Sequence, residues 1–328
     1  MIMSQGFEKK VEYYRKYIDK ALALQLRAVS GGVLREAIAH VAQAGGKRIR
    51  PILTLLSCEA TGGKIEDALP AAVAMETLHT FTLVHDDIMD NTALRRGVQT
   101  VHAKWDSHTA LLTGDTIAAL AIQSLARCTS PNVQRIFSIF ADAFRDVCIG
   151  QAMDKELESR DADKKKYMEM IGKKTAALFS ASTAIGACIG ASDESMITAL
   201  TGYGKELGIA FQIRDDTLDI VTDNKKIGKD IGSDIREGKK TFLYITAEKN
   251  AHANDAPLLQ KYAVNKGLRG RDVDALLAVY ERSHSVETAE KEIRRHTRRA
   301  IAQAESLPES NARGHLISMV ENLSGRVY

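Results

Sequence analysis

Long stretches free of helix-breaking residues constrain the fold of this chain more than any other feature of its sequence. Only five prolines fall among its 328 residues, and apolar residues recur every three or four positions in segments rich in Ala, Leu, Ile, Glu and Lys. Helices are therefore expected over 33–44, 52–60, 68–90, 133–158 and 199–221. Alternation with a period of two is nowhere sustained, so the pattern predicts an all-α fold.

The interruptions between these helices are short and carry Gly, Asn, Asp or clustered charge. They fall at 44–51, 159–166, 222–240 and 249–257. None is long enough to act as a linker between domains, and a large helical bundle can form one unit at this chain length. The sequence therefore predicts a single domain over residues 1–328.

Overall charge and cysteine content narrow the class of protein. With 45 basic and 42 acidic residues the formal net charge is only +3, which gives no indication of a nucleic acid or an anionic membrane as partner. The cysteines lie far apart and form no Cys-x-x-Cys pair, so a zinc or disulfide framework is disfavoured and the cytoplasm is the expected compartment. They are Cys58, Cys128, Cys148 and Cys188.

One uncharged run, "TAALFSASTAIGACIGAS" at 175–192, approaches the length of a membrane span. It contains Thr, three Ser and two Gly, a composition that favours a buried helix of the bundle. The first residues, "MIMSQGFEKK", contain no apolar stretch typical of a secretory signal. We therefore expect no transmembrane segment.

Two short acidic motifs stand inside otherwise apolar helical stretches. "DDIMD" at 86–90 and "DDTLD" at 215–219 both have the spacing Asp-Asp-x-x-Asp. On a helix that turns about 100° per residue, the first and last aspartates of each motif lie on the same face. Such close like charges destabilise a helix unless a divalent cation offsets their repulsion. The six residues are Asp86, Asp87, Asp90, Asp215, Asp216 and Asp219.

Carboxylate oxygens favour Mg²⁺, with Mn²⁺ as a substitute. Mg²⁺ commonly bridges a few carboxylates to phosphate oxygens, so the expected substrate is phosphorylated. A solvated acidic face is the alternative interpretation of one such motif, and a second copy inside an apolar helix weighs against it.

Cationic side chains accompany the acidic motifs, as an anionic substrate would require. "GGKRIRP" is suited to a turn that leads into a helix, whose N-terminal amides favour phosphate, and "RRG" offers bidentate contacts to an anion. The Gly-rich segment "KKIGKDIGSDIREGKKT" at 225–241 is a candidate lid. A solvated arginine pair remains the alternative for "RRG". The cations are Lys47, Arg50, Arg95, Arg96, Lys174, Lys229 and Lys239.

Taken in order, the motifs "GGKRIRP", "LVHDDIMD", "RRG", "GKKTAALF", "FQIRDDTLD" and "GKDIGSDIREGKKT" resemble those of the trans-isoprenyl diphosphate synthases over roughly residues 40 to 245. "HTFTLVHDDIMDNTALRRGVQTVH" is most similar to the geranylgeranyl diphosphate synthases of archaeal type. The resemblance implies a single-domain helical bundle around a deep central cavity, usually a homodimer. It also implies three Mg²⁺ ions and the head-to-tail condensation of isopentenyl diphosphate with an allylic diphosphate.

The resemblance also implies roles for individual residues. The metal ligands would be Asp86, Asp87, Asp90, Asp215 and Asp219. Isopentenyl diphosphate would be bound by Lys47, Arg50, His79 and Arg96, and the allylic diphosphate by Arg95, Lys174, Lys229 and Lys239. Catalysis would depend on Asp86 and Asp215 through the metal, and on Lys174, Thr175 and Gln212 near the developing cation.

Product length is expected to depend on the residues that precede the first acidic motif. By resemblance Phe81, Thr82 and Leu78 form the floor of the chain-length cavity, with Met75 and Ala74 deeper, and the pattern is that of C20 producers. An ideal helix turns Phe81 away from the face of Asp86, so this role requires a cavity that wraps around the helix. C15 and C25 or longer products are the alternatives.

Two other functions share part of this pattern. A class I terpene cyclase would have the first acidic motif and a helical fold, but "DDTLD" and "GGKRIRP" both argue against it. A non-catalytic partner subunit would normally have lost an acidic motif or the basic ligands, and neither is lost in this chain. The sequence therefore predicts an enzyme of the transferase class.

Overall fold

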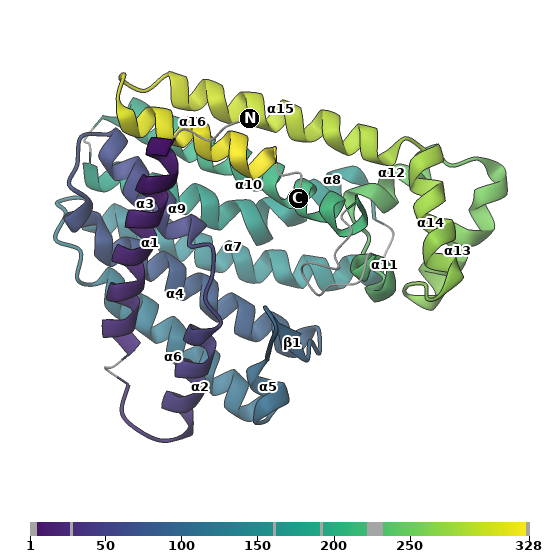
Figure 1. The fold of residues 1–328 in the computed structure, drawn as a ribbon, viewed down its shortest axis with the longest axis horizontal. Helices are drawn as coiled ribbons and strands as arrows, with labels where there is room; N and C mark the ends of the chain where they lie inside the picture. Colours follow the sequence, from purple (N-terminus) through teal and green to yellow (C-terminus); the bar gives the residue numbers. More distant parts are fainter. Residues whose placement is uncertain (1–4, 27–28, 160–161, 191–192, 222–231, 326–328) are drawn as a thin grey trace. The chain divides into compact units, whose positions relative to one another are not determined.

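The protein is described by a computed structural model that covers residues 5–26, 29–159, 162–190, 193–221 and 232–325. Helices make up most of this part of the chain, and its only paired strands are the two-residue β1 (Leu94–Arg95) and β2 (Val98–Gln99). The all-α prediction is therefore confirmed (Figure 1).

The chain divides into two compact units. The first comprises Met1–Arg145, Leu178–Gly204 and Ala302–Met319, and the second comprises Asp146–Ala177, Lys205–Ile301 and Val320–Tyr328. Five helices contribute residues to both: α7 (Val133–Ser159), α9 (Ala177–Gly190), α10 (Glu194–Val221), α15 (Ser285–Glu305) and α16 (Asn311–Ser324). The single domain expected over residues 1–328 stays a prediction.

The first unit is built around one long helix, α4. It also contains α1 (Gln5–Leu26), α2 (Val33–Gln43), α3 (Ile49–Ala60), α4 (Ile65–Met89), α5 (Val101–Lys104) and α6 (Ser107–Leu125). Helix α4 packs against α3 and α6 (Figure 1). Its residues 71–78 are all buried, because Ala, Val, Met and Leu face neighbours on every side. This packing holds the end of α4 that carries "DDIMD".

The second unit has its own apolar core. Its remaining elements are α8 (Lys164–Ile171), the π-helix η1 (Gly172–Ala176), α11 (Ser233–Glu237), α12 (Phe242–Asn250), the 3-10 helix η3 (Ala253–Asp255), α13 (Ala256–Asn265) and α14 (Arg271–Arg282). Helix α12 packs against α8 and α14 (Figure 1). Tyr167, Tyr244, Tyr262 and Tyr280 are almost wholly buried there, and large aromatic residues of this kind dominate the energetics of a core.

The uncharged run at 175–192 behaves as expected over its described residues. Nearly every residue of α9 from Leu178 to Cys188 is buried, which confirms a helix inside the bundle. Among the helices described, none is both long and apolar enough to cross a membrane.

Two local features were not predicted. The segment before α9 is wound as a π-helix, and the residues after α4 form a short hairpin. Both carry residues that the sequence had singled out, since η1 contains Lys174 and Thr175 and the hairpin contains Arg95 and Arg96.

Candidate active site

The first acidic motif lies at the C-terminal end of α4. Asp90 is the C-cap residue, and its backbone N–H donates to the carbonyl of Asp86 at 2.8 Å. Both of these side chains are partly exposed, whereas Asp87 is buried. Arg95 Nε donates to Asp87 Oδ1 at 2.7 Å. Burial raises the pKa of the Asp87 carboxyl, and the charge of Arg95 opposes that rise.

The hairpin after α4 fixes the arginine pair beside this motif. Leu94 pairs with Gln99 and Arg95 with Val98, so the loop contains only Arg96 and Gly97. Both loop residues have positive φ, 53° and 79°, as the tight turns that join antiparallel strands require. Arg96 donates to the carbonyl oxygen of Gly45 in the loop before α3. The turn therefore holds Arg96 against "GGKRIRP".

The basic side chains around the start of α3 make different contacts. Arg48, which adopts a positive φ at the start of α3, donates to Glu76 at 2.7 Å and to Asp19 at 2.8 Å. Arg50 stacks over the ring of Phe179 at 4.8 Å, and Lys47 is exposed. Arg48 therefore links the start of α3 to Asp19 of α1 and Glu76 of α4.

His79 lies on α4 among these cations. Burial lowers the pKa of His79 to well below its usual value, and Arg50, Arg96, Arg95 and Arg48 lower it further by charge repulsion. The imidazole is therefore neutral in the free protein. Arg48 and Arg95 are already paired with carboxylates, so Arg50 and Arg96 are the cations near His79 that favour an added anion.

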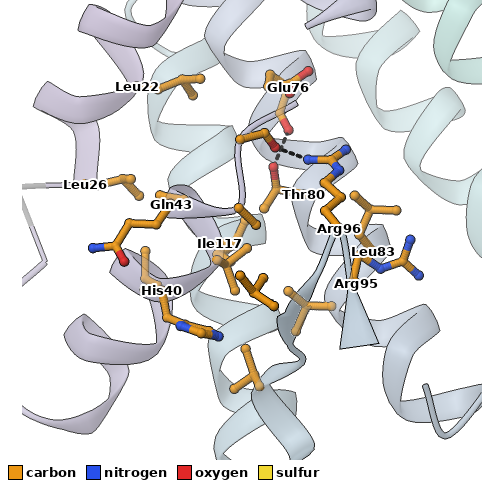
Figure 2. A pocket seen from close by; sticks show the side chains of 18 of the residues that line it. Leu22, Leu26, His40, Gln43, Glu76, Thr80, Leu83, Arg95, Arg96 and Ile117 are labelled. Atoms are coloured by element: carbon orange, nitrogen blue, oxygen red, sulfur yellow. Dashed lines mark hydrogen bonds between the residues drawn. The ribbon is translucent and has the colours of Figure 1, made fainter. Parts of the chain in front are cut away.

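A cavity of about 370 Å³ joins several of these residues within the first unit. His79, Asp87, Arg95 and Arg96 are among its lining residues. Figure 2 shows the two arginines on one side of the cavity and Leu22 and Leu26 of α1 on the other. Lys47 and Arg50 are not among the lining residues.

The two residues predicted to limit product length lie elsewhere on α4. Phe81 is buried and packs edge-on against Phe144 of α7 at 5.1 Å between ring centroids and against His85 at 4.6 Å. Thr82 donates its hydroxyl to the carbonyl oxygen of His79 at 2.8 Å. Neither lines the cavity of Figure 2.

The second acidic motif lies near the end of α10, and its three aspartates differ. Asp215 is exposed. Asp216 is buried and accepts hydrogen bonds from Tyr167 at 2.6 Å and from Gln212 Nε2 at 2.9 Å. Asp219 accepts from the hydroxyl of Ser233 and from the backbone N–H of Asp234. Burial raises the pKa of Asp216 to about 6. Asp216 is thus tied into the protein through Tyr167 and Gln212.

The π-helix η1 places Lys174 and Thr175. Thr175 Oγ1 donates to Gln212 Oε1 at 2.7 Å, and Lys174 pairs with Asp154. Helix α7 approaches η1 closely at Gly150, where an added Cβ would lie 2.3 Å from the backbone nitrogen of Lys174. Such π-helical turns occur frequently at functional sites.

A smaller cavity of about 100 Å³ lies at this place in the second unit. Its lining includes Asp154, Lys174, Thr175, Gln212, Asp216 and Lys239. Lys239 also pairs with Glu237 at 2.7 Å. Lys229 lies outside the residues that the structure describes.

Sequence reasoning missed three polar residues of this unit. Tyr167 holds Asp216, and Asp154 holds Lys174. Gln151 of α7 follows Gly150, is only 6% exposed, and neither of its amide atoms has a hydrogen-bond partner among the described residues. An unsatisfied buried amide is costly, which makes Gln151 a candidate ligand contact. No motif marks these three residues.

A divalent cation fits the chemistry of the acidic motifs. The partly exposed Asp86 and Asp90 offer oxygen donors one helical turn apart, the ligand type that Mg²⁺ prefers. In the portion of the chain with described positions, no group of three or more His, Cys, Asp or Glu side chains is arranged to hold a metal by itself. Substrate oxygens would have to complete the coordination, as is usual for Mg²⁺.

Known proteins are similar to this chain over most of its length. The family model described as polyprenyl synthetase matches residues 32–280. The chain is 42% identical over 283 residues to geranylgeranyl diphosphate synthase of Saccharolobus solfataricus, with 85% of each chain covered. It is 38% identical over 314 residues to short chain isoprenyl diphosphate synthase of Methanothermobacter thermautotrophicus, with 94% of this chain and 95% of the relative covered.

A crystal structure of geranylgeranyl pyrophosphate synthetase from Pyrococcus horikoshii is similar over 98% of each chain, with a TM-score of 0.92 and 37% identity. These matches define the class as isoprenoid synthases of all-α fold. The chain belongs to the polyprenyl synthetase family.

Proposed function

We propose that this protein condenses isopentenyl diphosphate with allylic diphosphates and releases geranylgeranyl diphosphate, the C20 product. The observation that carries the proposal is the meeting of Asp87, His79, Arg95 and Arg96 at one cavity of the first unit. That cavity combines a motif suited to metal binding with cations suited to a diphosphate. The similarity to geranylgeranyl diphosphate synthases supports the C20 assignment.

The carboxylates would hold Mg²⁺, with three ions per active site and Mn²⁺ as a substitute, as the family resemblance implies. Asp86, Asp87, Asp90, Asp215 and Asp219 are the proposed ligands. When bound, the metal supplies positive charge that stabilises the diphosphate leaving group. Asp87 would then be shared between Arg95 and the metal, since its carboxylate already accepts from Arg95.

The chain's own residues would act on both substrates. Arg95, Lys174, Lys229 and Lys239 bind the allylic diphosphate, and Lys47, Arg50, His79 and Arg96 bind isopentenyl diphosphate. The allylic carbon–oxygen bond breaks, diphosphate leaves with the electron pair, and the isopentenyl double bond forms the new carbon–carbon bond. The proton lost from the resulting cation passes to the released diphosphate, so no side-chain base is required.

Thr175 and Gln212 would stabilise the allylic cation with their dipoles. The Thr175 hydroxyl donates its hydrogen to Gln212, which leaves the lone pairs of its oxygen directed away from that bond. Gln212 is held at its other end by Asp216. Dipoles fixed before the reaction need no reorganisation as charge develops, which is the main advantage of such a site over water.

A homodimer is proposed from the exposed face of α6. Leu111, Leu112 and Ile122 are 48%, 53% and 47% exposed, and apolar side chains gathered on one helix face commonly mark a protein interface. Light scattering should give the molar mass of a dimer for the wild type, and Leu112→Lys should shift the equilibrium toward the monomer. Leu24→Lys, at an equally exposed leucine of α1, is the control. A wild-type protein that is monomeric at micromolar concentration would overturn the proposed homodimer.

The cytoplasm is the proposed compartment, because the four cysteines lie far apart in the sequence and form no Cys-x-x-Cys pair.

Incubation of the purified chain alone with Mg²⁺, isopentenyl diphosphate and a C5, C10 or C15 allylic primer tests the function. Dephosphorylated products are identified by chromatography. Linear prenols, mainly C20, are expected. Cyclic hydrocarbons from an allylic substrate alone would indicate a terpene cyclase, and turnover only after addition of a second protein would indicate a partner subunit.

A further inference from the structure

Helix α15 runs without a break through a strongly basic segment (Figure 1). Between Glu287 and Glu305, every exposed charged side chain of α15 belongs to a Lys or an Arg. These cations recur every three or four positions, so they share one face of the helix, and all of them lie in the second unit. We call this set the basic stripe, and it comprises Lys291, Arg294, Arg295, Arg298 and Arg299.

Mostly buried carboxylates hold three arginines of the basic stripe in place. A guanidinium group that is already held loses less conformational entropy when it binds a further partner. The three ion pairs are Arg295–Glu292 at 2.7 Å, Arg294–Glu290 at 3.7 Å and Arg299–Glu206 at 3.9 Å.

These carboxylates do not neutralise the basic stripe, because they are shared with cations of other helices. Arg214 of α10 donates to both carboxylate oxygens of Glu290. Lys164 of α8 pairs with Glu292. Three carboxylates are therefore shared by five Lys and Arg side chains.

The other two cations of the stripe add to this excess of positive charge. Among the described residues, no carboxylate pairs with Lys291 or Arg298. Like charges four residues apart destabilise a helix, and Arg298 lies four residues after Arg294. The formal net charge of the whole chain is only +3, so positive charge is concentrated on this face, and an anion bound along it would relieve the repulsion.

The form of the basic stripe favours an extended anionic surface over a small ion. Residues 291–299 span about 12 Å of helix at 1.5 Å per residue, and arginine contacts phosphate oxygens bidentately. No exposed side chain of α15 is aromatic or branched apolar. Single strands of nucleic acid bind through stacked aromatic residues, and protein partners bind through an apolar core of the interface. The phosphate groups of a lipid bilayer require neither.

We propose that the basic stripe binds this protein to bilayers that contain anionic phospholipids. The inference rests on the proposed function for its purpose, since the hydrocarbon chain of a C20 prenyl diphosphate is stabilised by transfer from water into a bilayer. Binding through charge alone is reversible and sensitive to salt. The cytoplasmic leaflet of a membrane carries a negative surface potential, which agrees with the proposed compartment.

Cosedimentation of the full chain with lipid vesicles tests this proposal. Binding is expected to vesicles of phosphatidylcholine mixed with phosphatidylglycerol, and it should weaken steeply as NaCl is added. Pure phosphatidylcholine vesicles should not bind the protein. The assay contains EDTA, so that no divalent cation can bridge the acidic motifs to lipid phosphates.

A double variant, Lys291→Gln with Arg298→Gln, removes the two cations that have no described carboxylate partner and keeps the three ion pairs of the stripe. Each Lys or Arg near an anionic bilayer strengthens binding about fivefold, so the double variant should bind about 25-fold more weakly. Lys249→Gln with Arg269→Gln is the matched control, because both residues are exposed in the same unit and the loss of charge is equal. Both double variants should keep the kcat and KM values of the wild type in the absence of vesicles.

Equal affinity of the two double variants for the anionic vesicles would overturn the proposal, and so would equal binding of the wild type to pure phosphatidylcholine. Tighter binding to duplex DNA than to the anionic vesicles, lost in the stripe variant alone, would assign the stripe to nucleic acid instead. Cosedimentation does not depend on turnover. Failure of the proposed function appears as absence of condensation, whereas failure of this inference appears as absence of stripe-dependent vesicle binding in an active enzyme.

Discussion

Thr175 and Gln212 form a hydrogen bond of 2.7 Å between the hydroxyl of the first and the amide oxygen of the second. Gln212 donates in turn to the buried Asp216, which also accepts from Tyr167. The amide of Gln212 therefore has one orientation, fixed at both ends, and Thr175 presents its oxygen at the wall of the small cavity.

Removal of the Thr175 hydroxyl should slow the reaction with little effect on substrate binding. Thr175→Val keeps the shape of the side chain, and we expect kcat to fall roughly tenfold or more while both KM values change little, because the lost dipole acts on the developing cation. Thr246→Val is the control, since the buried Thr246 hydroxyl only bonds the carbonyl of Phe242. Equal kcat in both variants would contradict the role of Thr175.

The two arginines of the hairpin should affect different substrates. We expect Arg96→Ala to raise the KM for isopentenyl diphosphate more than that for the allylic primer, and Arg95→Ala to do the reverse. Steady-state kinetics with each substrate varied in turn would measure this, with the exposed Arg127 replaced by Ala as a control. Equal changes in both KM values would argue against separate diphosphate sites.

Product length should respond to Phe81 and Thr82. Phe81→Ala removes a buried ring that packs on Phe144, so longer products are expected, and Thr82→Phe should shorten them toward C15. Phe81→Leu is a milder variant that limits the cost of an empty cavity. Chromatography of the dephosphorylated prenols gives the lengths, with the exposed Met89 replaced by Ala as a control. Unchanged lengths in all three variants would place the floor elsewhere, with Leu78 and Met75 as the next candidates.

The free energy of unfolding should fall at acid pH because of His79. Its pKa in the folded protein is well below the usual value of 6.5, so the unfolded chain binds a proton there that the folded protein rejects. The resulting stabilisation is fully present above pH 6.5 and is lost as the pH falls below that value. Urea unfolding at pH 7.5 and 5.5 should show a smaller loss for His79→Gln than for the wild type. The exposed His108 replaced by Gln is the control, and identical losses in all three would refute the assignment.

Much of the fold follows from helical periodicity because most helices bury one face or more. The predicted helix over 68–90 is α4, and that over 133–158 is α7, each within three residues at its ends. The π-helix η1 could not be predicted in this way. Its geometry depends on the close approach of α7 at Gly150, a tertiary contact that local propensity does not encode.

The acidic motifs could be recognised from the sequence because several like charges within one helix turn repel each other and therefore indicate a bound cation. The differences among the aspartates of each motif could not be predicted from the sequence. Asp87 differs from its neighbours by its burial and its hydrogen bond from Arg95. Asp216 differs by its burial and its hydrogen bonds from Tyr167 and Gln212. Gln151 was missed for the same reason. A single glutamine in a helix is ordinary in sequence, and only its burial without a described partner sets it apart.

Turnover of the Asp86→Ala and Asp215→Ala variants tests the central claim most directly, namely that catalysis needs both acidic motifs. With Mg²⁺ and both substrates, each variant should lose roughly 100-fold or more in kcat, with an unchanged helical circular dichroism spectrum. The exposed residues Asp142 and Asp274, in the first and second units, should tolerate Ala. Wild-type turnover in either the Asp86 or the Asp215 variant would contradict the account.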